Sequence, residues 1–162
     1  MDLRELFSII PPIRGVRVFE FSEDFDSSKE LAKKAKEMEF DLEIAVVNED
    51  DMNRFRELES EFVKVRYLDL SKNRYNQHSY LFDTVFINLN KDRIEKEGEN
   101  FFKKIYRMMK NAGVIVYPVD ESEREEKIEM LERLNYVAIN DISFQKGICA
   151  LTARKMHGWA KV

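Results

Sequence analysis

The residues best placed to do chemistry lie in the turn behind the first apolar run of the chain. That run, Val16 to Phe21, is β-branched and aromatic, which predicts a strand. The turn at residues 22–27 carries Glu23, Asp24 and Asp26 and contains no glycine. In α/β domains this turn usually cradles a phosphate or an amino acid with bare backbone, because glycine puts no Cβ in the way. Three carboxylates here would repel an anionic ligand unless they point away from it.

Three further side chains are candidates for catalysis. Asn88 and Asp120 stand at the ends of predicted strands, where α/β proteins often bind ligands, although Asn88 could instead cap its turn. His78 could act as a general base at the mouth of such a site. No nucleophilic triad or metal cluster can be assembled from His78, His157 and Cys149, and Cys149 is expected in the core because its strand is apolar.

A polar loop and the C-terminal tail are candidates for partner contacts. Residues 72–80 mix cations, amides and rings, among them Arg74 and Tyr75, which is the chemistry of base stacking and phosphate contact but also that of a solvated loop. With 27 Lys and Arg against 31 Asp and Glu, and no second basic stretch in the core fold, the sequence disfavours a nucleic-acid partner. The basic tail, residues 155–162, carries Trp159, which could meet a protein partner or a second copy, or fold back over a sheet edge.

The surrounding pattern predicts the elements that position these residues. A length of 162 residues with 44% hydrophobic content predicts one domain, residues 1–162, in which residues 1–12 form an N-terminal helix and linker. Capping-box patterns at Ser27 and Ser122 predict two helix starts, and Gly113 predicts a helix stop. Strands are predicted at residues 16–21, 42–47, 63–68, 84–89, 114–119, 136–144 and 148–154, and helices at 27–40, 50–62, 101–112 and 122–134.

The order of these segments defines the fold class. Alternating strands and helices imply right-handed crossovers and a parallel sheet. The last two strands are joined by the short connection Gln145 to Gly147, so they must form an antiparallel hairpin. The sequence therefore predicts an α/β three-layer sandwich with a mostly parallel seven-stranded sheet and a C-terminal antiparallel hairpin.

This order resembles that of class I S-adenosylmethionine-dependent methyltransferases over nearly the whole chain, and the hairpin ending distinguishes it from other α/β folds. The best local match runs from Phe82 to Asn88, followed by a long helix and by Asn111 to Val116. That match is similar to the family's fourth strand, its helix and the "gly-gly-val" approach to its fifth strand, with Ala112 replacing the first glycine.

The resemblance implies a Rossmann-like fold and a cofactor site. It implies that Glu20 holds the amino group of S-adenosylmethionine, that Glu49 or Asp50 meets the ribose hydroxyls, and that Asp69 faces the adenine. Acids at strand ends also cap helices or simply face solvent, so this alternative stays open. After the fourth strand, Asn88 and Asn90 stand where metal-dependent relatives carry acids. We expect no metal site, because amides are poorer ligands than carboxylates for a hard divalent cation.

Two functions remain open. We favour a methyltransferase-like binding or interaction module with a degenerate cofactor turn and no cofactor. The alternative is an active S-adenosylmethionine-dependent methyltransferase with a non-standard cofactor loop, because methyl transfer needs mainly proximity and alignment. The first residues lack the pattern of a signal peptide, no apolar stretch approaches the roughly 20 residues that span a bilayer, and the single cysteine suits a reducing compartment, so we expect a cytoplasmic protein without a membrane partner.

Overall fold

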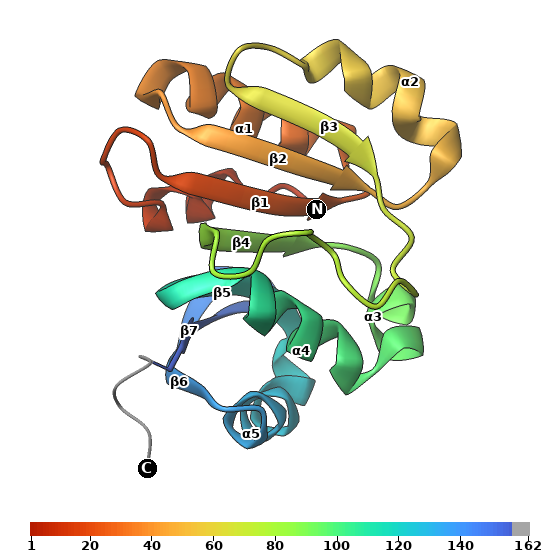
Figure 1. Cartoon of the computed structure of the whole chain (residues 1–162). Helices are drawn as coiled ribbons and strands as arrows, with labels where there is room; N and C mark the ends of the chain where they lie inside the picture. The colour runs from red at the N-terminus through yellow and green to blue at the C-terminus, as the bar shows by residue number, and fades with distance from the viewer. Residues whose placement is uncertain (157–162) are drawn as a thin grey trace.

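The computed structural model describes residues 1–156 and contains a seven-stranded sheet with the order β3-β2-β1-β4-β5-β7-β6 (Figure 1). Strands β1 to β5 are parallel, and β7 runs antiparallel to both of its neighbours, β5 and β6. The strands are β1 (Arg17–Ser22), β2 (Asp41–Val46), β3 (Val63–Tyr67), β4 (Phe82–Asn88), β5 (Met109–Asp120), β6 (Tyr136–Gln145) and β7 (Ile148–Lys155). The predicted mostly parallel sheet with a terminal hairpin is confirmed.

Helices cover both faces of this sheet and make the predicted three layers. One face is covered by η1 (Arg4–Ile9), α1 (Phe25–Met38), α2 (Met52–Phe55) and η3 (Arg56–Leu58). The other face is covered by α3 (Lys91–Glu97), α4 (Glu99–Met108) and α5 (Arg124–Arg133). Two further 3-10 turns, η2 (Glu49–Asp51) and η4 (Glu121–Glu123), lead into α2 and α5. In Figure 1, α4 and α5 lie in front of the sheet and α1 lies behind it.

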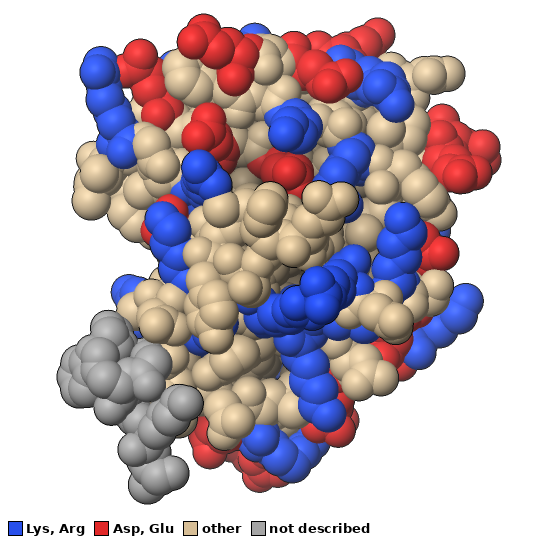
Figure 2. Space-filling view, viewed as in Figure 1, with Lys and Arg blue, Asp and Glu red and all other residues tan. Residues whose placement is uncertain are grey.

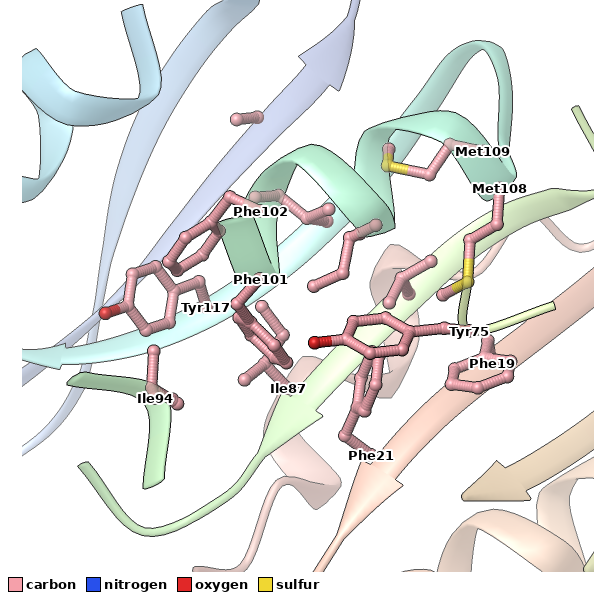
Figure 3. Close-up of a cluster of buried hydrophobic side chains, with 14 of the residues drawn as sticks. Phe19, Phe21, Tyr75, Ile87, Ile94, Phe101, Phe102, Met108, Met109 and Tyr117 are labelled. Atoms are coloured by element: carbon pink, nitrogen blue, oxygen red, sulfur yellow. The ribbon is translucent and has the colours of Figure 1, made fainter. Parts of the chain in front are cut away.

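Successive side chains of each strand point to opposite faces of the sheet, so a separate apolar core forms on each face. In β1, Phe19 and Phe21 point toward α4, while Val18 points toward α1. Figure 3 shows aromatic and methionine side chains from the sheet and α4 filling the core on the α4 side. Cys149 is buried in the same core, as predicted.

The loop between β3 and β4, residues 68–81, is a loop as the sequence predicts, and it packs on the α4 side of the sheet. Its anchor is Tyr75, which is 2% exposed and whose hydroxyl donates a hydrogen bond to the carbonyl of Leu70 at 2.9 Å. The Tyr75 ring lies 5.5 Å from that of Phe21 and 5.9 Å from that of Phe101 (Figure 3). The structure therefore places Tyr75 in the core rather than on the surface.

The predicted helix at residues 101–112 ends earlier than expected. Helix α4 stops at Met108, and Gly113 lies within β5 instead of ending the helix. A Cβ on Gly113 would sit 2.9 Å from the carbonyl oxygen of Lys110 and 3.0 Å from that of Phe82. Glycine is thus required here by the close approach of β4, and Ala112 beside it adopts a left-handed φ of 64°.

Both capping-box predictions are wrong. Helix α1 starts at Phe25, where the side chain of Asp24 accepts a hydrogen bond from the Ser27 amide at 3.0 Å, so Asp24 and not Ser27 is the N-cap. Before α5, Ser122 lies inside η4 and makes no side-chain cap. The predicted helix at residues 50–62 forms only η2, α2 and η3, and the N-terminal helix forms as the 3-10 segment η1.

One of the two edge strands of the sheet, β6, is irregular. Its pairing with β7 shifts register between Val137 and Asn140 and again between Ser143 and Gln145. Ala138, within the first shift, has a left-handed φ of 51°. Both shifts mark bulges at the edge of the sheet.

The remaining part of the predicted tail, including His157 and Trp159, lies outside the described residues. Among residues 1–156, no helix combines the length and apolar character needed to cross a membrane.

Candidate functional site

The sheet order reverses direction between β1 and β4, and a cleft opens at their carboxyl ends. In open α/β sheets this reversal point is where ligands bind. The cleft has a volume of about 530 Å³ and also reaches the end of β5. It is lined by Met1, Glu23, Asp24, Phe25, Asp26, Arg54, Ile87, Asn88, Leu89, Asn90, Lys91, Ile94 and Pro118.

Glu23, the first acid of the turn, makes its side-chain contacts with α3 and with the residue that precedes it. One carboxylate oxygen of Glu23 lies 3.0 Å from Nε of Arg93, and the other accepts a hydrogen bond from the backbone amide of Asn90 at 2.8 Å. The backbone amide of Glu23 donates to the carbonyl of Asn88 at 3.1 Å. Arg93 also donates to the side chain of Asn48. Glu23 therefore closes the turn across the ends of β1 and β4.

Asp24, the second acid of the turn, contacts the start of α1 and the first residue of the chain. The carboxylate of Asp24 accepts from the amide of Ser27, and its second oxygen lies 2.5 Å from the amino group of Met1. Burial opposes the charged form of Asp24, but these contacts outweigh it and hold the pKa of Asp24 below its usual value. The carbonyl of Met1 in turn accepts a hydrogen bond from Nδ2 of Asn88 at 2.8 Å. Met1 thus covers the polar groups of Asp24 and Asn88.

The outer rim of the cleft is more open. The Asp26 side chain is 91% exposed, and its nearest cation is Arg54 at 3.9 Å. The guanidinium of Arg54 stacks over the Phe25 ring at 4.1 Å from the ring centroid. The three acids of the turn therefore have different roles, because Glu23 and Asp24 hold the protein together and Asp26 alone faces solvent.

Glu20 lies beneath the turn and is fully buried. The Ser28 hydroxyl donates a hydrogen bond to Oε1 of Glu20 at 2.6 Å, and Oε2 has no partner among the described residues. Burial raises the pKa of Glu20 to about 8, although the bond from Ser28 opposes the shift. The side chain points toward α1 and does not line the cleft.

The other two acids predicted to contact a cofactor lie elsewhere. Glu49 is exposed at the start of η2. Asp69 is exposed behind β3, where its Oδ1 accepts from the amide of Ser71 at 2.9 Å and from the Ser71 hydroxyl at 2.8 Å. These bonds from Ser71 hold the pKa of Asp69 below its usual value, with a smaller effect of the positive charges of Lys72 and Lys104. The structure does not bring Glu20, Glu49 and Asp69 together around the cleft.

Of the candidate catalytic residues, Asn88 and Asp120 come close to the cleft. Asn88 is 6% exposed in its wall, and Asp120 lines a smaller adjoining hollow of about 100 Å³. Lys91 lies 3.4 Å from Asp120 and 2.8 Å from Glu123, so Asp120 is part of an ion-paired group. His78 is exposed in the β3–β4 loop and does not line the cleft.

The predicted partner residues are also separated. Arg74 is exposed, Tyr75 is buried, and Trp159 is outside the described residues. Across residues 1–156, no three His, Cys, Asp or Glu side chains come together as a metal site would require.

Some residues of the cleft went unnoticed in the sequence. Met1, Arg54 and Arg93 reach the turn from distant parts of the chain, and nothing in their local sequence marks them. Pro118 and Lys91 stand at the ends of predicted strands, so the rule that ligands meet the carboxyl ends of parallel strands could have found them.

The sequence matches no known protein-family profile and no curated protein. The fold, in contrast, matches many solved structures. A S-adenosylmethionine-dependent methyltransferase from Aquifex aeolicus superposes with a TM-score of 0.77 at 14% identity, over 96% of this chain and 90% of that one. Phosphoethanolamine N-methyltransferase 2 from Haemonchus contortus, in complex with S-adenosyl-L-methionine, gives 0.73 at 15% identity, over 96% and 52%. The CurJ carbon methyltransferase gives 0.68 at 10% identity, over 95% and 52%.

The protein therefore has the Rossmann-like fold of class I S-adenosylmethionine-dependent methyltransferases. This chain spans about half the length of the Haemonchus and CurJ chains. At these identities the likeness concerns the fold alone.

Proposed function

We propose that this protein is a methyltransferase-like binding module whose cleft does not take S-adenosylmethionine in the usual way of the fold. The observation that carries the proposal is the turn between β1 and α1. Its acids Glu23 and Asp24 are already committed to Arg93, to the Asn90 amide and to the start of α1. A glycine-rich turn would leave its backbone open to a ligand, whereas this turn is filled by its own side chains.

The polar groups of the cleft support the same proposal. The carboxylate of S-adenosylmethionine would meet like charge at Asp24 and at the exposed Asp26, whereas its cationic amino and sulfonium groups would not be repelled there. The amide of Asn88 could otherwise donate to that group, but it donates to Met1. The residues present therefore do not fit the cofactor in this arrangement, and we derive no methyl-transfer step from it.

A second candidate function rests on the cleft itself. A volume of about 530 Å³ falls within the range of small-molecule sites, and the cleft lies at the reversal point of the sheet. An active methyltransferase with a non-standard cofactor loop would need Met1 to move away from Asn88 and Asp24. Asp26 could then contact the amino group of the cofactor.

Calorimetric titration with S-adenosylmethionine and S-adenosylhomocysteine separates the two functions. We expect no binding to the wild-type protein at ligand concentrations up to about 1 mM. Asp26→Ala removes the most exposed carboxylate of the cleft, and Glu37→Ala removes an exposed carboxylate outside it as the matched control. Binding at about 10 μM or tighter would overturn the proposal, and a loss of that binding in Asp26→Ala alone would place the ligand in the cleft.

We propose that residues 1–162 act as one domain, in the cytoplasm, with a protein partner or a second copy of the chain. The free thiol of Cys149 supports a reducing compartment. Exposed Arg74 supports a contact through the β3–β4 loop, because an exposed guanidinium is a frequent contributor to interfaces.

A further inference from the structure

We propose that a basic hollow on the outer side of α3 and α4 binds single-stranded nucleic acid. The basic hollow is defined by four cations, Lys96 of α3 and Lys103, Lys104 and Arg107 of α4. It lies apart from the cleft, so the proposal goes beyond the function of that cleft and holds whether or not a cofactor binds there.

The four cations are available for an anionic partner. Among the described residues, none of them has a carboxylate within 4 Å, although one acid, Glu97, also lines the hollow. Neighbouring cations are neutralised by ion pairs, such as Lys110 with Asp83 at 3.4 Å and Arg133 with Glu99 at 2.9 Å. Figure 2 shows Lys and Arg side chains gathered over α4 and α3 on the visible face.

The hollow is concave and partly preorganised. Its volume is about 640 Å³, and the amide side chains of Asn73 and Asn100 line it together with the cations. Lys104 is half-buried, and its ammonium donates to the carbonyl of Leu70 at 3.2 Å and lies 5.1 Å from the Tyr75 ring centroid. Cations that are already ordered lose less freedom on binding, and the amides can hydrogen-bond to base edges.

An exposed aromatic residue, Tyr80, lies beside the end of α4, next to the hollow-lining residue Arg107. The backbone amide of Tyr80 donates to the carbonyl of Arg107 at 3.1 Å, so the two residues are adjacent. Tyr80 as a whole residue is 59% exposed, and the ammonium of Lys155 lies 3.8 Å from the centroid of its ring. A ring that is held from one side and open on the other can serve as a stacking platform for a base.

The position of the cations explains why the sequence disfavoured such a partner. The sequence disfavours nucleic acid because the chain is acidic overall and no second basic stretch in the core fold extends the loop at residues 72–80. In the structure, Asn73 of that loop and three cations of α4 line the same hollow, and Lys72 and Lys104 both act on Asp69. The chain as a whole is acidic, at −4, but four of its cations line this one hollow.

Nucleic acid fits this surface better than an acidic peptide does. Both would satisfy the cations, but only bases would use the open Tyr80 ring and the two amides together. Helix α4 has ten residues and is about 15 Å long, which suits a short stretch of single strand. Unpaired bases are free to stack on a side chain, whereas those of a duplex are not.

The test is fluorescence anisotropy with labelled oligouridylate and oligothymidylate of about ten nucleotides. We expect binding to both, with affinity that falls as salt rises. For four neutralised phosphates on a single strand, the affinity should fall roughly 50-fold between about 50 and about 200 mM salt. A duplex of the same length and a polyglutamate peptide serve as competitors and should displace the oligonucleotide poorly.

Two matched pairs of variants locate the site. Lys103→Glu with Arg107→Glu should weaken binding at least about tenfold, because two phosphate contacts become repulsive. Lys33→Glu with Lys36→Glu makes the same change in net charge, from −4 to −8, at exposed positions of α1 on the opposite face, and should weaken binding far less. Tyr80→Ala should weaken binding roughly tenfold, and Tyr80→Phe should stay within about twofold of the wild type.

Thermal melting of each variant confirms that it is folded. The proposal is overturned by absence of binding at about 50 mM salt, or by equal losses in the α3–α4 and α1 charge variants. Polyglutamate that competes as well as oligouridylate, with no effect of Tyr80→Ala, would assign the surface to an acidic protein instead.

Discussion

Glu20 shows how burial alone can change the chemistry of a side chain. It lies in the middle of β1, where it has no access to solvent and a single hydrogen bond from Ser28. With its pKa raised to about 8, this carboxyl is mostly protonated at neutral pH in the folded state. An unfolded chain would ionise it near its ordinary value of 4.5.

This difference makes stability depend on pH. The folded state binds the proton of Glu20 more tightly, so the stability is greatest below about pH 4.5 as far as this group is concerned and falls as pH rises toward 8. The slope should reach up to about 1.4 kcal/mol per pH unit. Glu20→Gln should flatten the profile in urea denaturation between pH 5 and pH 8, because glutamine resembles the protonated acid. Exposed Glu37→Gln is the control, and an unchanged slope in Glu20→Gln would contradict the assignment.

Ala112 and Gly113 are neighbours whose local geometries favour opposite substitutions. Ala112 has a left-handed φ of 64°, which costs about 1–2 kcal/mol in a residue with a Cβ. Ala112→Gly should therefore stabilise the protein by about 0.5 kcal/mol, since the added flexibility of glycine offsets part of the relief. Gly113→Ala should destabilise it by about 1–3 kcal/mol, because its Cβ would meet two backbone oxygens. Guanidinium denaturation measures the free energy of unfolding of both variants. If Gly113→Ala were the more stable of the two, the local geometry of these residues would not explain their stability.

At the scale of single elements, the start of α1 depends on Asp24. Asp24→Ala removes the oxygen that accepts from the Ser27 amide and should cost about 1 kcal/mol of stability. Asp24→Asn keeps an oxygen acceptor and should recover most of that loss. Thermal unfolding of the two variants measures the difference. Equal losses would mean that the charge of Asp24, through its contact with Met1, matters more than the cap.

The local sequence does not decide which residue caps the start of α1. Both Ser27 and Asp24 are good caps, and the glutamate three residues after Ser27 favours the wrong one. Asp24 is the cap because α1 begins at Phe25, whose ring packs on Phe55 at 5.5 Å. That contact joins two helices, so no local pattern contains it.

For the whole molecule, the sequence predicts the succession of strands along the chain and a mostly parallel sheet, because alternation of strands and helices allows few topologies. The hairpin at the end was equally clear, since three residues between two strands permit only an antiparallel return. The cleft is different. Its turn is closed by Glu23 and Arg93, which are far apart in the chain, and Asn88 is covered by Met1. The acids themselves could be predicted, but their partners depend on the folded arrangement.

Tyr75 joins the long β3–β4 loop to the body of the protein. Tyr75→Ala should cost about 3–5 kcal/mol, because it removes a buried ring between Phe21 and Phe101. Tyr75→Phe keeps the ring and loses only the hydrogen bond to Leu70, so it should cost about 1 kcal/mol. Chemical denaturation compares the two. A loss below about 1 kcal/mol in Tyr75→Ala would mean that the loop is not packed on the sheet.

The two bulges of β6 have a consequence for how copies of this protein can meet. A regular outer strand offers an unbroken row of backbone donors and acceptors on which another strand can be added. Here the register shifts at Val137 and Ser143 break that row into short pieces. This edge of the sheet is therefore poorly suited to continue from one molecule into the next, which protects it against fibril growth at high concentration. Two copies that met at β6 would have to join through side chains.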